Sequence, residues 1–552
     1  MEKENRTRIV FNILAVICIL LFCFALTPKS LQNDTFYTIK IGEHILQNGI
    51  NMVDPFSWHE NLPYTYPHWL YDVGIYLIYN NLGGMTGIYI STIILSMILG
   101  LTLYFTNLKL SKNQLTSFII TLGLIYLLRN YIAARAQLLT FILFALTIYF
   151  IEMFLETKHK RYAIGLIIIP IIIANVHCAV WPFYFVLFLP YIAEYLICVI
   201  RDSHLNYIIK IKYLTRKIKK LAQKDGKEEK IIELEKQLEE EKINLNKSIE
   251  KNKKLEINPY KIKIEKRNAT KWLIVIMLIC TLTGLLTPLG DTPYTYLIKT
   301  MQGNTTKNIS EHLPLVLAQN MDAIIVLVIF IGILMFTDTK IKLRDLFMVC
   351  GLTILMFSTR RQFSMLVLIC GYILNRLICS LFDKYDPSGS EKMIKAMTSI
   401  LGKILTILFI VLISIYFYKD KVNDNYINTS SYPVDAAQYI KDNLDVKNIR
   451  LFNDYNYGSY LLYQDIPVFI DSRADLYAPE FSGWDKDIFT DFINVSSIST
   501  YYETKFEEYG ITHIITYSNS KLSMLLSMDE KYKQLYNDDK FVIYQRLENV
   551  EK

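Results

Sequence analysis

The sequence opens with MEKENRTRIVFNILAVICILLFCFAL (residues 1–26), a basic leader followed by a mainly apolar block from Ile9 to Leu26. A block of about 17–25 apolar residues is long enough to cross the hydrocarbon core of a bilayer as a helix. The segment that follows, LTPKSLQND (26–34), does not resemble the small-residue cleavage site that ends a signal peptide. We therefore expect a first transmembrane helix that stays in the protein.

The composition extends this expectation to the whole chain. Its 552 residues are 52% hydrophobic, with a mean hydropathy of +0.25, which is too apolar for an ordinary soluble protein. Apolar blocks of near-spanning length recur, so we expect a polytopic α-helical membrane protein with about eleven spans. Their approximate ranges are 9–27, 85–107, 115–131, 137–155, 162–176, 180–200, 271–288, 321–337, 344–358, 362–382 and 399–418.

The loops between these blocks predict the orientation of the chain. Lysine and arginine gather in alternate loops, and short basic loops stay on the cytoplasmic side of a membrane. The basic segments are 3–8, 109–112, 158–161, 340–344 and 383–395. We expect a cytoplasmic N-terminus, whereas the extracytoplasmic parts are 28–84, 129–136, 176–180, 288–319, 359–362 and everything after Lys419.

Residues 204–267 interrupt this pattern with an insert rich in Lys and Glu. Apolar residues recur at spacings of three or four in both halves, which is typical of paired helices. They are Ile208, Ile211, Leu214, Ile218 and Leu221, then Ile231, Leu234, Leu238, Leu245 and Ile249. We expect a cytoplasmic coiled-coil hairpin that turns at Asp225-Gly226. It is interpreted as a spacer, and the alternative is a docking site for a cytoplasmic protein partner.

The region 421–552 has the composition of a soluble domain. The segment VDAAQYIKDNL (434–444) is amphipathic and follows Pro433. Four runs are strand-like: NIRLFN (448–453), IPVFID (466–471), ITHIITY (511–517) and KFVIYQRL (540–547). Alternating helices and strands predict a small extracytoplasmic α/β domain with a partly parallel sheet.

Cysteine usage and net charge exclude several classes of protein. All eight cysteines lie in or beside apolar blocks and no CxxC pair occurs, so neither a disulfide framework nor a zinc site is indicated. The net charge of +7 resides largely in short loops and is interpreted as topology information. Nothing in the sequence indicates nucleic-acid binding.

Ionisable residues also gather at the predicted outer ends of the spans. Four of them are arginines, against the usual distribution of positive charge, so we expect an anion to compensate them. A guanidinium suits phosphate, and a nearby carboxylate could deprotonate a hydroxyl or bind a divalent metal. Interfacial anchors or internal ion pairs are the alternative. The set is Asp34, Glu43, His44, Asp54, His59, His68, Asp72, Arg129, Arg135, His177, Asp291, Glu311, His312, Arg360 and Arg361.

The first outer loop has an internal pattern of its own. TFYTIKIGEHILQNG (35–49) and HWLYDVGIYLIYNNLGG (68–84) are amphipathic and end at glycine, which predicts two short interfacial helices. Between them, DPFSWHENLPYTYP (54–67) is rich in proline and aromatic residues. We expect this loop to cover a site for a lipid-like ligand.

These segments together resemble the bacterial multi-span glycosyltransferases of the GT-C superfamily. The similar features are ND (33–34), DPFSW (54–58), the HWL helix that ends in LGG (68–84), RAQ (135–137), NVH (175–177) and TPLGD (287–291). RLFNDYNYGSYLLYQDIPVFIDSRADLY (450–477) is similar to the outer domain of one branch of these proteins. The resemblance covers the membrane core and the C-terminal domain and leaves 204–267 as an insertion.

The resemblance implies a reaction and roles for particular residues. Such enzymes use polyprenyl-phosphate-linked sugars, and by position Asp34 would be the catalytic carboxylate, as a general base or a metal ligand. Asp54 is the second choice, although an Asp before proline also commonly caps a turn. Position 33 is Asn where the superfamily often has a second acidic residue, so use of Mg²⁺ or Mn²⁺ stays open. Arg129, Arg135, Arg360 and Arg361 would bind the donor phosphate, and His68, His177, Asp291 and Glu311 would shape the acceptor or sugar pocket.

The C-terminal segment DSRADLY (471–477) is a further candidate. It brings Asp471, Arg473 and Asp475 together just after a strand-like run, and ligands often bind at the carboxyl ends of strands in α/β domains. We expect either a contact with a glycan or a structural ion-pair turn.

The expected function is a multi-pass glycosyltransferase of a bacterial plasma membrane that transfers sugar to a cell-envelope glycan, lipid or protein. One alternative is a lipid-linked glycan polymerase or ligase. Another alternative is a transporter or flippase, which would need polar residues through the bilayer midplane, where these spans carry almost no charge. A third alternative is a scaffold of surface-glycan assembly. The expected domains are 1–203 (the first half of the core, with the catalytic loop 28–84), 204–267 (the hairpin), 268–420 (the second half of the core) and 421–552.

Overall fold

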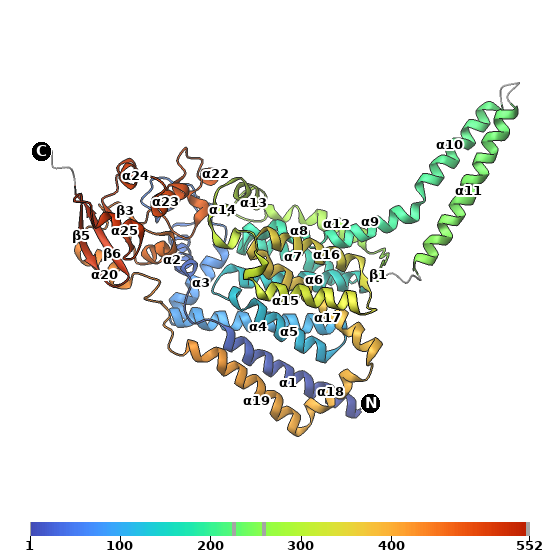
Figure 1. The fold of residues 1–552 in the computed structure, drawn as a ribbon, viewed down its shortest axis with the longest axis horizontal. Coiled ribbons are helices and arrows are strands. Elements are labelled where there is room, and N and C mark those ends of the chain that lie inside the picture. The colour runs from blue at the N-terminus through green and yellow to red at the C-terminus, as the bar shows by residue number, and fades with distance from the viewer. Residues whose placement is uncertain (1, 223–227, 257–260, 548–552) are drawn as a thin grey trace.

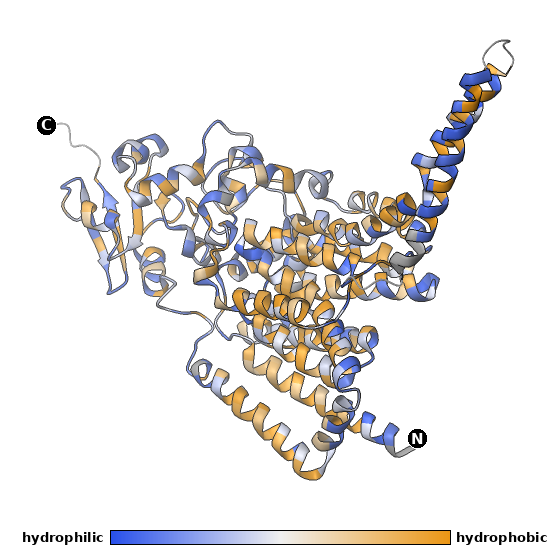
Figure 2. Ribbon diagram, turned by 45° about the vertical axis from the view of Figure 1, so that its right-hand side comes forward, coloured by the Kyte–Doolittle hydropathy of each residue, from blue (hydrophilic) through white to orange (hydrophobic). Residues whose placement is uncertain are grey.

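The computed structural model describes residues 2–222, 228–256 and 261–547 and is mostly helical (Figure 1). Apolar helices run side by side in a bundle, the C-terminal domain covers one end of it, and a long helical hairpin leaves near the other end (Figure 1). We call these the domain end and the hairpin end. Figure 2 shows that hydrophobic residues dominate the bundle and hydrophilic residues the hairpin.

Within the described residues, six helical segments are long and apolar enough to cross a membrane: Glu4–Leu26, Met85–Ser111, Ala136–Thr157, Cys178–Leu221, Arg360–Tyr385 and Ile400–Tyr418. Thr270–Leu285 and Met321–Phe336 are shorter apolar helices. The chain is therefore a multi-pass membrane protein. Each expected span corresponds to one helix, except that 180–200 corresponds to two, α8 and α9. Several helices are shorter than a span, since α5, α12 and α16 have 15, 11 and 16 residues.

The helices of the bundle are α1 (Glu2–Leu26), α4 (Met85–Ser111), α5 (Gln114–Leu128), α6 (Ala136–Thr157), α7 (Lys160–Val176), α8 (Trp181–Val186), α9 (Leu189–Ser203), α12 (Thr270–Cys280), α15 (Met321–Phe336), α16 (Leu343–Ser358), α17 (Phe363–Tyr385) and α19 (Ile400–Tyr418). Short helices α13 (Thr292–Gln302) and α14 (Thr305–Asn308) lie between α12 and α15, and α18 (Gly389–Thr398) lies between α17 and α19.

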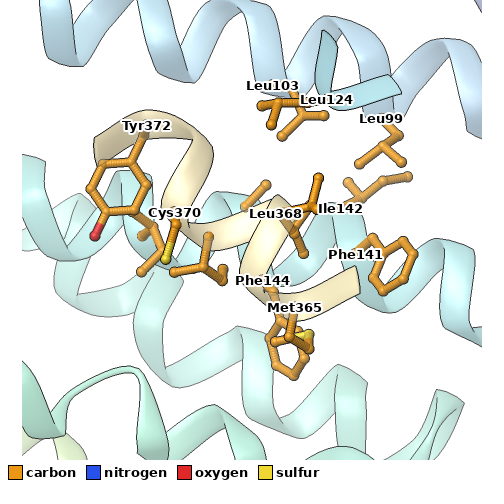
Figure 3. Close-up of a cluster of buried hydrophobic side chains, with 14 of the residues drawn as sticks. Leu99, Leu103, Leu124, Phe141, Ile142, Phe144, Met365, Leu368, Cys370 and Tyr372 are labelled. Carbon is orange, nitrogen blue, oxygen red and sulfur yellow. The ribbon is translucent and has the colours of Figure 1, made fainter. Parts of the chain in front are cut away.

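Helix α17 is central to the core of the bundle. Its side chains pack against α4, α5 and α6, and Gly371 lets Leu124 of α5 approach so closely that an added Cβ would lie 2.5 Å from it. Side-chain packing of this kind drives helix association inside a bilayer, where water is absent. Figure 3 shows part of this core: Leu99 and Leu103, Leu124, Phe141, Ile142 and Phe144, and Met365, Leu368, Cys370 and Tyr372.

A buried ion network lies near the hairpin end of the bundle. Arg344 of α16 lies 2.9 Å from Glu194 of α9 and 3.5 Å from Glu152 of α6. Arg376 of α17 lies 2.7 Å from Asp345 and 3.5 Å from Glu152. The expectation of almost no charge concerned the bilayer midplane, and the charges near this end compensate one another inside the protein.

The first loop contains the two expected helices, α2 (Asn33–Asn48) and α3 (Trp69–Asn81), with Gly49 directly after the first. They cross closely at Gly42, where an added Cβ would lie 2.1 Å from the carbonyl oxygen of Asp72. Only glycine permits this approach. The loop therefore folds as a compact helical pair at the domain end.

The insert forms two paired helices, α10 (Leu205–Leu221) and α11 (Glu228–Glu256). Leu214 and Leu234 are buried between them, as the heptad pattern predicts. The expected turn at Asp225-Gly226 lies outside the described residues. After the hairpin, β1 (Ile262–Lys263) pairs in parallel with β2 (Ile341–Lys342) just before α16, a connection that the sequence pattern did not predict.

The C-terminal domain contains a four-stranded mixed sheet in the order β3-β4-β6-β5. Strands β3 (Leu451–Phe452) and β4 (His513–Tyr517) are parallel, while β6 (Phe541–Arg546) is antiparallel to β4 and to β5 (Tyr532–Asn537). The helices are α20 (Val434–Asn443), α21 (Tyr455–Tyr463), α22 (Pro479–Ser482), α23 (Ile488–Ser497), α24 (Tyr502–Tyr509) and α25 (Lys521–Leu526). The expected partly parallel sheet is confirmed, although β5 was not predicted.

The run IPVFID (466–471), predicted as a strand, is not part of this sheet. It is buried, but its backbone bonds to the side chain of Asn453 and not to a neighbouring strand. Phe469 N–H donates to Asn453 Oδ1 at 2.8 Å, and Asn453 Nδ2 donates to Ile470 O at 2.7 Å. Val468 forms an isolated bridge with Ser57 of the first loop. The run thus joins the domain to the loop.

Candidate functional site

A cavity of about 700 Å³ lies at the domain end, where the first loop, the bundle and the C-terminal domain meet. Its walls come from α2 and the loop before α3, from the ends of α6, α7 and α16, from α13 and from the segments around α21 and α22. Among the predicted site residues, those that line it are Asp34, His68, Arg135, His177, Glu311, Arg361, Arg473 and Asp475. The fold thus brings these predicted site residues together around one cavity.

Asp34 and Arg135 form the polar centre of this cavity. Asp34 lies in the first turn of α2, Arg135 directly precedes α6, and their Oδ2 and Nη2 atoms are 2.7 Å apart. Glu311 lies 3.5 Å from the same guanidinium. Burial alone would lower the pKa of Arg135, but the charges of Asp34 and Glu311 raise it. The Oδ1 atom of Asp34 makes no hydrogen bond within the described residues, so this oxygen is open to a ligand.

Arg361 differs from the other arginines of the site. It lies in the 3-10 turn Arg360–Gln362 between α16 and α17. Within the described residues, its guanidinium has no carboxylate within 4 Å and donates no hydrogen bond. It also borders a second cavity of about 180 Å³, together with Arg135, Glu311 and Arg360. A partly buried cation without a partner favours an anionic ligand.

Two histidines line the cavity next to one another, with ring centroids 5.1 Å apart. Burial, with the charges of Arg135 and Arg361, lowers the pKa of His68 to about 3, and burial, followed by His68 and the same arginines, lowers that of His177 well below its ordinary value. Both imidazoles are therefore neutral near pH 7.

The tautomer of His177 follows from its partner. Thr140 Oγ1 lies 3.0 Å from His177 Nδ1, and the Thr140 hydroxyl donates its proton to Ala136 O, also at 3.0 Å. With the hydroxyl proton on Ala136 O, His177 Nδ1–H is the donor in this contact and Nε2 carries the lone pair. This arrangement equips His177 to accept a proton or a hydrogen bond.

Asp475 brings the C-terminal domain into the cavity wall. Tyr296 of α13 donates a hydrogen bond to it at 2.6 Å and Thr305 of α14 another at 3.2 Å. Burial raises the pKa of Asp475, and these two donors only partly offset that effect. The carboxyl group therefore holds α13 and α14 against the domain at the edge of the cavity.

Arg473 lies at the back of the cavity in a buried triad. Its side chain is 3% exposed and lies 2.6 Å from both Asp54 and Asp471. Asp54 also accepts the Ser57 backbone N–H at 2.8 Å, as expected for an Asp that caps a turn. Burial alone would raise the pKa of Asp54, but Arg473 and Ser57 lower it. Asp54 and Asp471 do not line the cavity, and the triad ties the first loop to the C-terminal domain.

Three other predicted residues also lie away from the main cavity. Arg129 is 3.0 Å from Asp322 and stacks on Tyr126, with its guanidinium 4.0 Å from the ring centre. Asp291 precedes α13 on the surface. Arg360 borders only the smaller cavity, and its Nε donates to Pro314 O at 3.4 Å. Arg129 thus has the ion-pair role that the sequence left as the alternative.

Several residues of the cavity were not predicted from the sequence. They form an aromatic and apolar lining around the charged centre: Tyr37, Tyr64, Tyr71, Phe183, Tyr296, Met301, Leu355 and Tyr455. The aromatic-rich segment 54–67 was a signal for part of this lining. The others come from elements far apart in the sequence, and no local pattern marks them.

The cavity does not offer a cage for a metal ion. Among the residues that the structure describes, no three His, Cys, Asp or Glu side chains come together as metal ligands. Asp34 is paired with Arg135, and Asp475 already accepts two protein hydrogen bonds. We therefore derive no step through a metal.

Neither comparison with protein-family models nor a search of curated proteins gives a match to this sequence. A functional assignment must therefore come from the geometry of the cavity.

Proposed function

We propose that the protein is a glycosyltransferase of the GT-C type, which moves a sugar from a polyprenyl-phosphate donor to a cell-envelope glycan, lipid or protein. One observation carries this proposal: the unpaired guanidinium of Arg361 and the open carboxylate oxygen of Asp34 line the same cavity, at one end of a membrane bundle. An anion site and a base beside each other suit transfer from a phosphate leaving group.

The proposed orientation is that of a bacterial plasma-membrane protein with its hairpin end in the cytoplasm. Support comes from the basic loops 109–112, 158–161, 340–344 and 383–395, which join helices at the hairpin end. The domain end, with the cavity and the C-terminal domain, is then extracytoplasmic. A polyprenyl-linked sugar would reach the cavity from the outer leaflet.

Donor binding follows from the lining. Arg361 and Arg135 would hold the lipid phosphate, and a phosphate that bound Arg135 would also free Asp34 from its ion pair. Phe183, Met301 and Leu355 supply apolar surface for the first isoprene units. Met301 is 74% exposed, so the apolar lining continues to the surface of the bundle, where the lipid chain can leave.

In the chemical step, the acceptor hydroxyl oxygen attacks the anomeric carbon of the sugar. The proton of the hydroxyl passes to Asp34 Oδ1, and the bond between the anomeric carbon and the phosphate oxygen breaks. The bonding electrons leave with the phosphate, whose added negative charge Arg361 and Arg135 stabilise. The products are the glycosylated acceptor and polyprenyl phosphate.

A lipid-linked glycan polymerase or ligase is the second candidate, and the histidine pair favours it. His177 Nε2 carries a lone pair at the cavity and could replace Asp34 as the base. The two candidates differ in the residue whose loss stops the chemistry.

The test compares lipid-linked sugars and surface glycans in cells with the wild type, a deletion, Asp34→Asn or His177→Gln, at matched protein levels. We expect the deletion and Asp34→Asn to accumulate one lipid-linked sugar and to lose one glycan. Asp442→Asn, on the exposed face of α20, serves as the matched control. If only His177→Gln reproduces the deletion, the base is the imidazole. If both variants behave as wild type, the cavity is not the transfer site.

A further inference from the structure

Helix α10 of the hairpin has an unusual distribution of charge. Among its residues, Leu205 to Leu221, are six cations and no acidic residue: Lys210, Lys212, Arg216, Lys217, Lys219 and Lys220. Within the described residues, only Lys210 has a carboxylate within 4 Å, which is Glu241 of α11 at 3.0 Å. The other five charges are not compensated by the hairpin itself.

The same helix exposes an apolar row. Leu205, Ile209 and Tyr213 follow one another at four-residue spacing and are 57%, 56% and 60% exposed. Residues at this spacing lie above one another on a helix. The buried seam with α11 runs through other positions, among them Leu214. The apolar row is therefore a separate face, which the hairpin leaves uncovered.

Helix α11 is acidic only in its first half, since residues 242–256 include five lysines and two glutamates. Residues 228–241 include seven glutamates and two lysines. Figure 1 shows the hairpin leaving the bundle obliquely, with α10 and α11 side by side along its length. The hairpin thus has a basic, partly apolar face on α10 and an acidic segment in the first half of α11.

Helix α10 is also continuous with the membrane segment before it. Helix α9 ends at Ser203, α10 begins at Leu205, and Cys178–Leu221 forms one helical segment with an apolar window of spanning length. The first turns of α10 therefore start at the bilayer surface. Helices that lie on anionic membranes typically insert apolar residues into the bilayer, while their basic residues stay at the headgroups.

We propose that α10 is a binding surface for anionic lipid headgroups of the leaflet at the hairpin end. Leu205, Ile209 and Tyr213 insert at the headgroup boundary, and Lys212, Arg216, Lys219 and Lys220 bind the lipid phosphates. This contact fixes the hairpin on the membrane, which leaves α11, with its acidic first half, as the free face.

The experiment uses the full chain, one copy per nanodisc, in discs wide enough to leave lipid beside the bundle. A polarity-sensitive fluorophore is attached at Tyr213→Cys, or at Ile232→Cys of α11 for comparison. The background is Cys350→Ser, because Cys350 is the exposed cysteine of the described chain. The discs contain phosphatidylcholine alone or with about one third phosphatidylglycerol.

We expect the label at position 213 to report an apolar environment in the anionic discs, and the label at 232 to report water in both. Lys212→Glu/Arg216→Glu/Lys219→Glu should abolish the shift at 213. Lys230→Glu/Lys236→Glu/Lys247→Glu, the same change of charge on α11, should preserve it. The proposal is overturned if position 213 reports water in both lipids, if its shielding ignores lipid charge, or if shielding requires two copies per disc, which would indicate a protein contact instead.

Discussion

The hairpin-end ion network and the domain-end cavity both contain arginines inside the protein. They differ in whether carboxylates lie beside the guanidinium groups. In the network, the Arg344 side chain is 1% exposed and lies within 4 Å of Glu152, Glu194 and Glu265. In the cavity, Arg361 has no such neighbour among the described residues. A buried cation that carboxylates surround is a structural element, whereas one left unpaired beside a cavity indicates an anionic ligand.

The largest effect should come from breaking the network. Arg344→Met would leave three carboxylates without their shared cation, at a cost of about 3–5 kcal/mol in the free energy of unfolding. Thermal melting in detergent measures this. Lys384→Met is the matched control, because the Lys384–Asp338 pair, 2.8 Å apart, is exposed and contributes little. If Arg344→Met melts like the control, the network is not structural.

The opposite result is expected in the cavity. Arg361→Met should leave the melting temperature unchanged or raised, because no carboxylate loses a partner, and should lower the transfer rate by about 10²–10³-fold, as for loss of one electrostatic donor to a leaving group. The measurement is transfer from the lipid-linked sugar once it is identified. Arg129→Met should lower the melting temperature, since it removes the partner of Asp322, and should leave the transfer rate unchanged. Equal behaviour of the two variants would contradict the distinction between paired and unpaired arginines.

A pH titration extends the comparison to a buried group that stays neutral. His59 Nε2 lies 2.8 Å from Phe469 O, and burial lowers the pKa of His59 to about 4. The unfolded chain, with a histidine pKa of about 6.5, binds more protons between these values. Stability should therefore fall by about 1.4 kcal/mol per pH unit as the pH drops from 6.5 to 4, roughly 3 kcal/mol in all.

The measurement is the melting temperature of wild type and His59→Gln between pH 7 and 4. Glutamine keeps a donor for Phe469 but does not titrate, so the variant should lose less stability in acid. His68 and His177 also resist protonation, which is why the difference between the two proteins, and not the wild-type slope alone, is the readout. Parallel curves would show that His59 does not titrate with the fold.

The smallest effect on the transfer rate should come from an unpaired group that does not face the cavity. Asp72 of α3 is fully buried, and neither carboxylate oxygen has a hydrogen-bond partner of normal geometry among the described residues. Burial raises the pKa of Asp72 well above its ordinary value, and Thr38 and Arg473 only partly offset this. The folded state thus keeps a proton that the unfolded chain releases above about pH 4.

Stability linked to Asp72 is therefore present below about pH 4 and lost as the pH rises. Asp72→Asn should raise the free energy of unfolding at pH 7, and the gain should vanish below about pH 4. Transfer activity should not change. A loss of activity in a stable Asp72→Asn protein would mean that unpaired groups outside the cavity also serve the chemistry.

Much of the architecture could be predicted because local patterns encode it. Apolar length marked the membrane helices, heptads marked the hairpin, and the glycines at 49 and 83–84 marked the ends of the loop helices. The run IPVFID was wrongly predicted as a strand. Buried β-branched residues give the same sequence pattern whether a neighbouring strand or an asparagine side chain bonds to their backbone. Strand β5, YKQLYN, carries little apolar signal of its own.

The site was less predictable, because pairing is a property of the fold. Arg129 and Arg361 are both outer arginines in the sequence, and only the position of Asp322, far along the chain, shows that the first is engaged. Asp54 was the second choice for the catalytic carboxylate, and only the fold shows that Arg473 engages it. Charges in α6, α9, α16 and α17 lie too far apart in the sequence to show that they compensate one another.

The triad of Asp54, Arg473 and Asp471 also constrains how the protein is made. Asp54 and Arg473 are 419 residues apart, so the ribosome completes the first loop long before its partner exists. Until then, Asp54 lacks the guanidinium with which it pairs in the folded protein. The domain end is therefore completed late in synthesis, and the proposed catalytic cavity forms only after the C-terminal domain has been made and has folded.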